Sequence, residues 1–203
     1  CLFRRCRPLL RRMIAMLLER KLVEEAISAG AAKAVVILQE QIVLSAAFRD
    51  ICAGNACGKY GLCYMCPPDV GDIEQLMETV RRYPRALVYQ TISPLEDSFD
   101  YEGMVDAGYR HARLSQRLQD KLADLLPQGF LHLTCGGCRL CETCGKAEGK
   151  PCRYPDRALP SVESYGIDVY NTVKDTELKY INGPNTVTFF AMALYVPEEA
   201  SLG

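Results

Sequence analysis

The sequence lacks the features that indicate several common functions. Its 203 residues have a formal net charge of −1, so no excess of basic side chains indicates a nucleic-acid or membrane-surface partner. No apolar run reaches the roughly 18 residues that a transmembrane helix needs. Neither a G-x-G-x-x-G segment nor a Walker A segment is present, so nothing supports nucleotide binding. We therefore expect a cytoplasmic protein that does not bind nucleic acid.

Histidine is scarce, whereas cysteine is abundant. The two histidines, His111 and His132, are expected to be packed or surface side chains rather than metal ligands, with a proton donor near the second cysteine cluster as the alternative for His132. The 11 cysteines are about 5% of the chain, below the roughly 8–10% of small disulfide scaffolds. Their number is odd, and nine of them lie in two tight clusters, which favours metal or cluster ligation over disulfides.

The second cluster has the more diagnostic spacing. Cys138, Cys141 and Cys144 form C-x2-C-x2-C, and Cys152 follows in "PCRYP". Bacterial-type ferredoxins hold [4Fe–4S] clusters with such a triplet and a further cysteine followed by proline. Structural zinc usually takes two separated C-x2-C knuckles, so it is the less favoured alternative. Cys135 is a fifth thiol that could be an alternative ligand, a free thiol or a packed side chain.

The first cluster reads "CAGNACGKYGLCYMCPP" and places Cys52, Cys57, Cys63 and Cys66 within 15 residues. It is rich in glycine and contains no histidine. Proline after Cys66 is also found where ferredoxin loops close. We predict a second [4Fe–4S] cluster here, with zinc or free redox thiols as the alternatives.

Apolar periodicity predicts alternating helices and strands. Helices are expected at 9–29, 72–83, 101–126 and 161–175, the last with Ser161 as its N-cap, and strands at 32–39, 85–93, 129–134 and 186–196. The fold class is therefore α/β or α+β, as a single compact layered domain over 22–203 from which two cysteine-rich loops emerge. Residues 1–21 are basic and are expected to extend the first helix; Cys1 and Cys6 lie there without partners at ligand spacing.

Several longer segments make the chain similar to a known family. They are "C…C-x-x-YG-x-C-x-x-CPP" at 52–68, "C-x-x-C-x-x-C…GKPCRYP" at 138–155, "PSVESYGIDV" at 160–169 and "NGPNTVTFF" at 182–190. These segments resemble the predicted metal-binding proteins of domain-of-unknown-function family 2284. The resemblance implies metal or iron–sulfur binding and a mostly anaerobic microbial setting, without implying a reaction. It covers roughly residues 22–196 and leaves out the basic N-terminus.

Three functions follow as hypotheses. The first is a redox protein with two [4Fe–4S] clusters that passes electrons to or from a redox partner protein. The second is a reductase or activator, hence an oxidoreductase, with a small-molecule pocket near 153–168. In that pocket, acid–base chemistry could come from Glu163, Tyr165 and Asp168. An anion could bind to Arg153 and Arg157. The third is a zinc-stabilised interaction module without a redox role.

Overall fold

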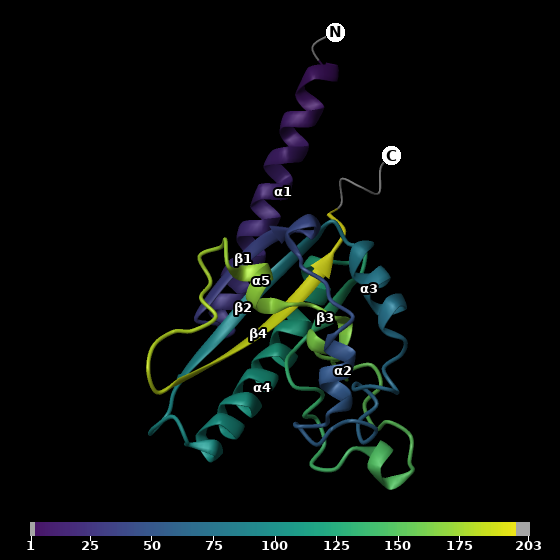
Figure 1. Cartoon of the computed structure of the whole chain (residues 1–203). Coiled ribbons are helices and arrows are strands. Elements are labelled where there is room, and N and C mark those ends of the chain that lie inside the picture. Colours follow the sequence, from purple (N-terminus) through teal and green to yellow (C-terminus); the bar gives the residue numbers. More distant parts are fainter. Residues whose placement is uncertain (1–2, 198–203) are drawn as a thin grey trace.

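The protein is built around one antiparallel sheet. A computed structural model describes residues 3–197, with side chains from residue 12 onward. The four strands are β1 (Lys33–Leu38), β2 (Arg85–Pro94), β3 (Phe130–Leu133) and β4 (Thr186–Tyr195). They lie in the order β1-β2-β4-β3, and every neighbouring pair is antiparallel. The fold class is therefore α+β (Figure 1).

Strand alternation divides the core between the two faces of the sheet. On β2, Leu87 and Tyr89 face one way and Ala86 and Val88 the other, as the two-residue period of a strand requires. The helices α1 (Phe3–Ser28) and α4 (Tyr101–Leu125) cover the Leu87 face. The opposite face is covered by α3 (Ile73–Arg81), by α5 (Val169–Val173) and by the segment around Val162. The sheet is thus buried on both sides.

The predicted strands and long helices agree with the structure, and most of their ends differ by only one or two residues. The helix α1 starts at Phe3, so the basic residues extend the first helix as expected, and its first turns extend away from the sheet (Figure 1). Cys1 lies outside the described residues, and so does the side chain of Cys6. Among the described residues, no helix is both long and apolar enough to cross a membrane.

The helix predicted at 161–175 is wrong as a single element. The structure has a 3-10 turn at Glu163–Tyr165 and then the short helix α5. Gly166 separates them with φ +72°, and a Cβ there would lie 2.9 Å from Met77 Sδ. Only glycine adopts this left-handed conformation without cost, so the chain turns instead of continuing the helix. Ser161 accepts a hydrogen bond from the N–H of Ser164 (3.1 Å), but the N-cap of the 3-10 turn is Val162 and not Ser161 as predicted.

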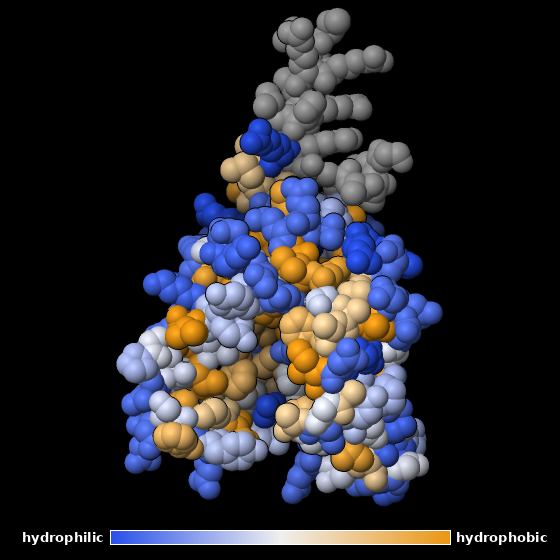
Figure 2. All heavy atoms as spheres, viewed as in Figure 1, coloured by the Kyte–Doolittle hydropathy of each residue, from blue (hydrophilic) through white to orange (hydrophobic). Residues whose placement is uncertain are grey.

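The two cysteine-rich loops lie together beyond one end of the sheet, although the strands that precede them, β1 and β3, run in opposite directions. The first, 52–71, begins in a short helix, α2 (Phe48–Ala53), that was not predicted, and it leads into α3. The second, 135–160, follows β3 and is closed at its base by a parallel bridge between Thr134 and Ser161. Figure 1 shows the loops at the lower end of the molecule. In Figure 2, hydrophobic residues are interspersed with hydrophilic ones over this face, including that lower end.

Candidate metal centre

Direct contacts join the two cysteine loops. The Tyr64 hydroxyl in the first loop donates a hydrogen bond to the carbonyl of Lys150 in the second (2.9 Å). Lys146 forms an ion pair with Asp69, and its ammonium lies 5.6 Å from the centroid of the Tyr64 ring. The loops are 86 residues apart in sequence at the Tyr64 contact. They therefore form one structural unit rather than two separate modules.

The second set of predicted ligands surrounds a small cavity of about 20 Å³. We call it the Cys141 cavity. Its cysteines are Cys63, Cys138, Cys141, Cys144 and Cys152. The second loop supplies four of these five, and the first loop adds Cys63. The structure thus brings together all four cysteines predicted for this centre and places one thiol of the other predicted set beside them.

A larger cavity of about 290 Å³ holds the remaining thiols of the first loop. We call it the Cys52 cavity, and its cysteines are Cys52, Cys57 and Cys66. Glu163 also lines it, together with the backbone of the second loop at Gly136 and Gly137. Most of the remaining wall is apolar and comes from α2 and the first loop. Both loops therefore contribute to both cavities.

Cys63 and Cys66 connect the two cavities. The Cys66 thiol donates a hydrogen bond to Cys63, which lowers the pKa of Cys63 to about 6 and raises that of Cys66. Cys63 also receives hydrogen bonds from the backbone N–H of Cys138 and from the thiol of Cys144. Cys63 is accordingly the thiol most stabilised as a thiolate in this region, and thiolates are the form that binds metal.

Other thiols of the two loops have a raised pKa, because burial disfavours the charged thiolate. Burial raises the pKa of Cys138 to about 11 and also raises that of Cys52, where the charge of Glu163 adds to the effect. In the protein without metal these two groups are thiols at neutral pH. A metal would displace their protons, so binding is expected to become stronger as the pH rises.

The donor set and the backbone both suit a thiolate-bound centre. Gly136 and Gly137 have φ of +62° and +80°, and a Cβ added to Gly137 would lie 2.7 Å from Cys66 Sγ. The absence of side chains here lets the backbone approach the sulfur closely, as the amides around iron–sulfur clusters do. The cysteines between Cys52 and Cys152 are all free thiols. These observations fit a group held by several cysteines.

The thiols line the cavity walls without closing around a point. Over residues 12–197, no three His, Cys, Asp or Glu side chains form a group that could hold a metal ion. The number and the spacing of the cysteine thiols therefore indicate the kind of metal centre that these loops can hold.

The two histidines belong to the core and line neither cysteine cavity. His132 lies between the hydroxyl of Tyr89 and the amide oxygen of Gln119, each at 2.8 Å. His111 contacts the hydroxyl of Thr91 at 2.9 Å. Burial lowers the pKa of His132 to about 3 and that of His111 to about 4, so both are neutral at physiological pH.

Cys135, the fifth thiol of the second cluster, is buried and lines neither cavity. Burial strongly raises its pKa, so it is a protonated thiol. It follows Thr134 at the point where the second loop leaves the sheet. Its position is that of a packed side chain beneath the loop.

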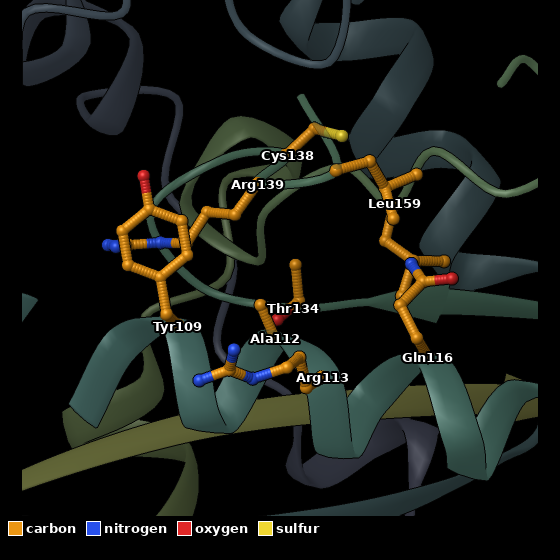
Figure 3. A pocket seen from close by; sticks show the side chains of 9 residues that line it. Tyr109, Ala112, Arg113, Gln116, Thr134, Cys138, Arg139 and Leu159 are labelled. Atoms are coloured by element: carbon orange, nitrogen blue, oxygen red, sulfur yellow. The ribbon is translucent and has the colours of Figure 1, made fainter. Parts of the chain in front are cut away.

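A third cavity, of about 140 Å³, lies between α4 and the second loop (Figure 3). Cys138 lines this Arg139 cavity as well as the Cys141 cavity. The Arg139 guanidinium carbon is 5.1 Å from the centroid of the Tyr109 ring. A Cβ at Gly108 would come within 2.9 Å of the guanidinium, so a larger residue there would require the Arg139 side chain to shift. Nothing in the sequence pattern indicates this contact.

Most of the polar residues singled out near 153–168 make structural contacts. Arg153 donates to the carbonyl of Thr143 (2.8 Å) and to Glu148 (2.7 Å). Arg157 is paired with Asp120. Asp168 caps α5, and Tyr165 packs in the core.

Glu163 is the exception among these residues. It faces the Cys52 cavity, and burial raises the pKa of its carboxyl. One of its oxygens, Oε2, is shielded from solvent and has no hydrogen-bond partner. From the sequence, Glu163 is a possible acid–base residue, although it reads equally well as a residue of a helix start.

A family model described as "Predicted metal-binding protein (DUF2284)" matches residues 35–195. The match spans both cysteine loops and all four strands except the start of β1. No curated protein and no solved structure matches the chain. Because the family model covers well over half of the sequence, the chain belongs to this family of predicted metal-binding proteins.

Proposed function

We propose that the protein is an iron–sulfur redox protein that holds two clusters and passes single electrons to or from a partner protein. The observation that carries the proposal is the gathering of eight thiols, without histidine, around two adjoining cavities. Such a donor set is typical of [4Fe–4S] centres. The cluster, when bound, supplies one-electron transfer, and the chain supplies its ligands and its surroundings.

The second loop is the strongest support for iron. Three cysteines spaced three apart can wrap one side of a cluster, and Cys152 reaches the same cavity from the far end of the loop. Gly145 helps this return, because a Cβ there would lie 2.5 Å from the carbonyl oxygen of Pro151. The loop thus closes on itself so that all four cysteines of the motif share one cavity.

The hydrogen bond between Cys63 and Cys66 supports electron exchange between two centres. Each of these thiols lines a different cavity, and the two residues are joined by one tight turn. Groups held in the two cavities would therefore be neighbours. Cys57 is exposed, so the Cys52 cavity also lies near the protein surface, where a partner can approach.

A zinc-stabilised interaction module is the second candidate function. The Cys141 cavity of about 20 Å³ has room for a single ion, and its cysteines arrive from two loops, as in structural zinc sites. This reading assigns no redox role to the Cys52 cavity.

Anaerobic purification followed by measurement of iron, acid-labile sulfide and zinc distinguishes the two candidates. The redox proposal expects a brown protein with sulfide equal to iron and an electron paramagnetic resonance (EPR) signal after reduction with dithionite. Colourless protein that contains zinc and no sulfide would contradict it and support the second candidate.

A further inference from the structure

We propose that the Cys52 cavity is a ligand-binding site in which three cysteines, Cys52, Cys57 and Cys66, hold a metal centre whose remaining position faces a small, largely apolar molecule. Glu163 would engage the single polar group of that molecule. The inference rests on the proposed function, because it requires a metal centre in this cavity. It differs from the sequence-based ligand set in leaving Cys63 out of this centre.

The thiols of Cys63 and Cys66 point into different cavities. Cys63 and Cys66 are joined by a turn in which the Cys66 N–H donates to the Cys63 carbonyl (3.0 Å). This turn directs Cys66 into the Cys52 cavity and Cys63 into the Cys141 cavity. In that cavity Cys63 lies with Cys138 and Cys144 of the second loop. Three cysteines remain around the Cys52 cavity, one fewer than a cluster with four cysteine ligands needs.

One carboxyl oxygen of Glu163, Oε2, is buried without a hydrogen-bond partner. Leaving a buried polar atom without a partner costs about 1–3 kcal/mol, and native structures seldom do so without a reason. Ser161, beside it in sequence, lines the same cavity and fixes the 3-10 turn through the N–H of Ser164. Glu163 is therefore held in place by the fold with one oxygen unused, which is the arrangement expected of a group that binds a ligand.

The size and lining of the cavity define the class of ligand. A volume of about 290 Å³ is close to the lower end of the range for small-molecule sites. Phe48, Ile51 and Tyr60 give it apolar walls. An anionic ligand would face the Glu163 carboxyl and is disfavoured. The site suits a small apolar molecule that carries one hydroxyl or carbonyl oxygen.

The test uses tert-butyl isocyanide, an apolar molecule that binds iron only where a coordination position is open. It is added to the anaerobically prepared, dithionite-reduced full chain, and the EPR spectrum is followed. We expect a saturable change of one of the two cluster signals in the wild-type protein. This readout needs no knowledge of the natural substrate and no enzymatic assay.

Two matched variants locate the response. Ala56 lines the Cys52 cavity and Ala53 does not, although both are exposed residues at the start of the same loop. Ala56→Phe should raise the half-saturating isocyanide concentration at least about tenfold, equivalent to about 1.4 kcal/mol. Ala53→Phe should leave it unchanged. Equal effects of the two substitutions would overturn the placement of the ligand in this cavity.

Cys63→Ser separates the two possible ligand sets. If three cysteines hold the centre, wild type and Cys63→Ser both respond to isocyanide. If Cys63 is the fourth ligand, wild type does not respond and the variant does, which would overturn the inference. A response found only in Glu163→Gln would likewise overturn it, because Glu163 would then occupy the position itself.

The failure of this inference can be distinguished from the failure of the proposed function. Iron and sulfide that are present, with EPR signals unchanged by isocyanide in wild type, overturn the inference and leave the redox proposal standing. Protein without iron overturns both.

Discussion

The thiol of Cys66 donates a hydrogen bond to Cys63, yet the two side chains line different cavities. Only two residues of one turn, Tyr64 and Met65, separate these two cysteines, so a change in the charge of one cavity acts on the thiol of the other. The loops that hold these thiols depend on each other for their positions, since Tyr64 in one is hydrogen-bonded to Lys150 in the other.

Removal of metal should loosen the first cysteine loop. Around residues 53–62 the chain is largely exposed and contributes nothing to either hydrophobic core, so bound metal is the main source of order that we expect there. Treatment with a chelator should therefore accelerate proteolytic cleavage between Ala53 and Tyr64, as mapped by mass spectrometry. Cleavage in the β2–α4 connection at 95–100 serves as the control and should not change. Equal protection of the first loop with and without metal would argue against a centre in the Cys52 cavity.

Cys135 should be dispensable for metal loading. It lies outside both cavities, and burial keeps it protonated, so Cys135→Ser should retain the iron content of wild type. Iron per chain after anaerobic reconstitution measures this directly. Loss of iron in Cys135→Ser, together with full loading of Cys138→Ser, would show that the ligand register of the second loop is shifted by one cysteine.

Gly137 should be needed for the approach of the backbone to Cys66. Gly137→Ala introduces a Cβ at 2.7 Å from Cys66 Sγ and places alanine at φ +80°. Gly149→Ala is the matched control, because Gly149 has φ +66° in the same loop and open space around it. Both variants carry the conformational cost of about 1–2 kcal/mol, but only Gly137→Ala should also lower iron content. Equal iron content in the two variants would show that the close approach is not needed for loading.

The buried histidines should make the fold sensitive to acid. Burial places the pKa of His132 near 3 in the folded protein, below the ordinary value of about 6.5 in the unfolded chain. The unfolded state therefore takes up the proton first as the pH falls, and stability is lost between about pH 6.5 and pH 3. At pH 5 this single group should lower the free energy of unfolding by about 2 kcal/mol relative to pH 8.

The difference between wild type and His132→Gln isolates this effect from acid loss of metal. Urea unfolding followed by circular dichroism should show a smaller decrease between pH 8 and pH 5 for the variant. Parallel pH dependences of the two proteins would contradict the assignment of His132 as a neutral core residue.

The elements that could be predicted from sequence are those with a clear hydrophobic period. The strand at 186–196 and the helix at 101–126 are examples, because burial on one or both faces determines their residue types. The order β1-β2-β4-β3 could not be predicted, since it depends on which strands pair across long separations. The helix α2 was missed because six residues are too few to show a period. At Gly166 the left-handed backbone, with φ +72°, interrupts the helical pattern.

The candidate site was predictable as a set of cysteines but not as a geometry. Spacing alone identified the eight thiols, because cysteines this close in a chain with a large core favour shared ligation. Spacing could not show that Cys63 crosses to the cavity of the second loop, since that depends on how the two loops pack. Glu163 was a candidate acid–base residue from sequence, but its place beside Cys52 and Gly136 could not be predicted, because both are far away in sequence.

The iron content of single-cysteine variants tests the central claim most directly. With two [4Fe–4S] clusters, wild type should contain about eight irons and about eight sulfides per chain, and Cys141→Ala and Cys52→Ala should each lose about half. The two substitutions combined should remove nearly all of the iron, because each acts on a different cavity. Zinc without sulfide in wild type, or iron and spectra unchanged in Cys141→Ala, would contradict the account.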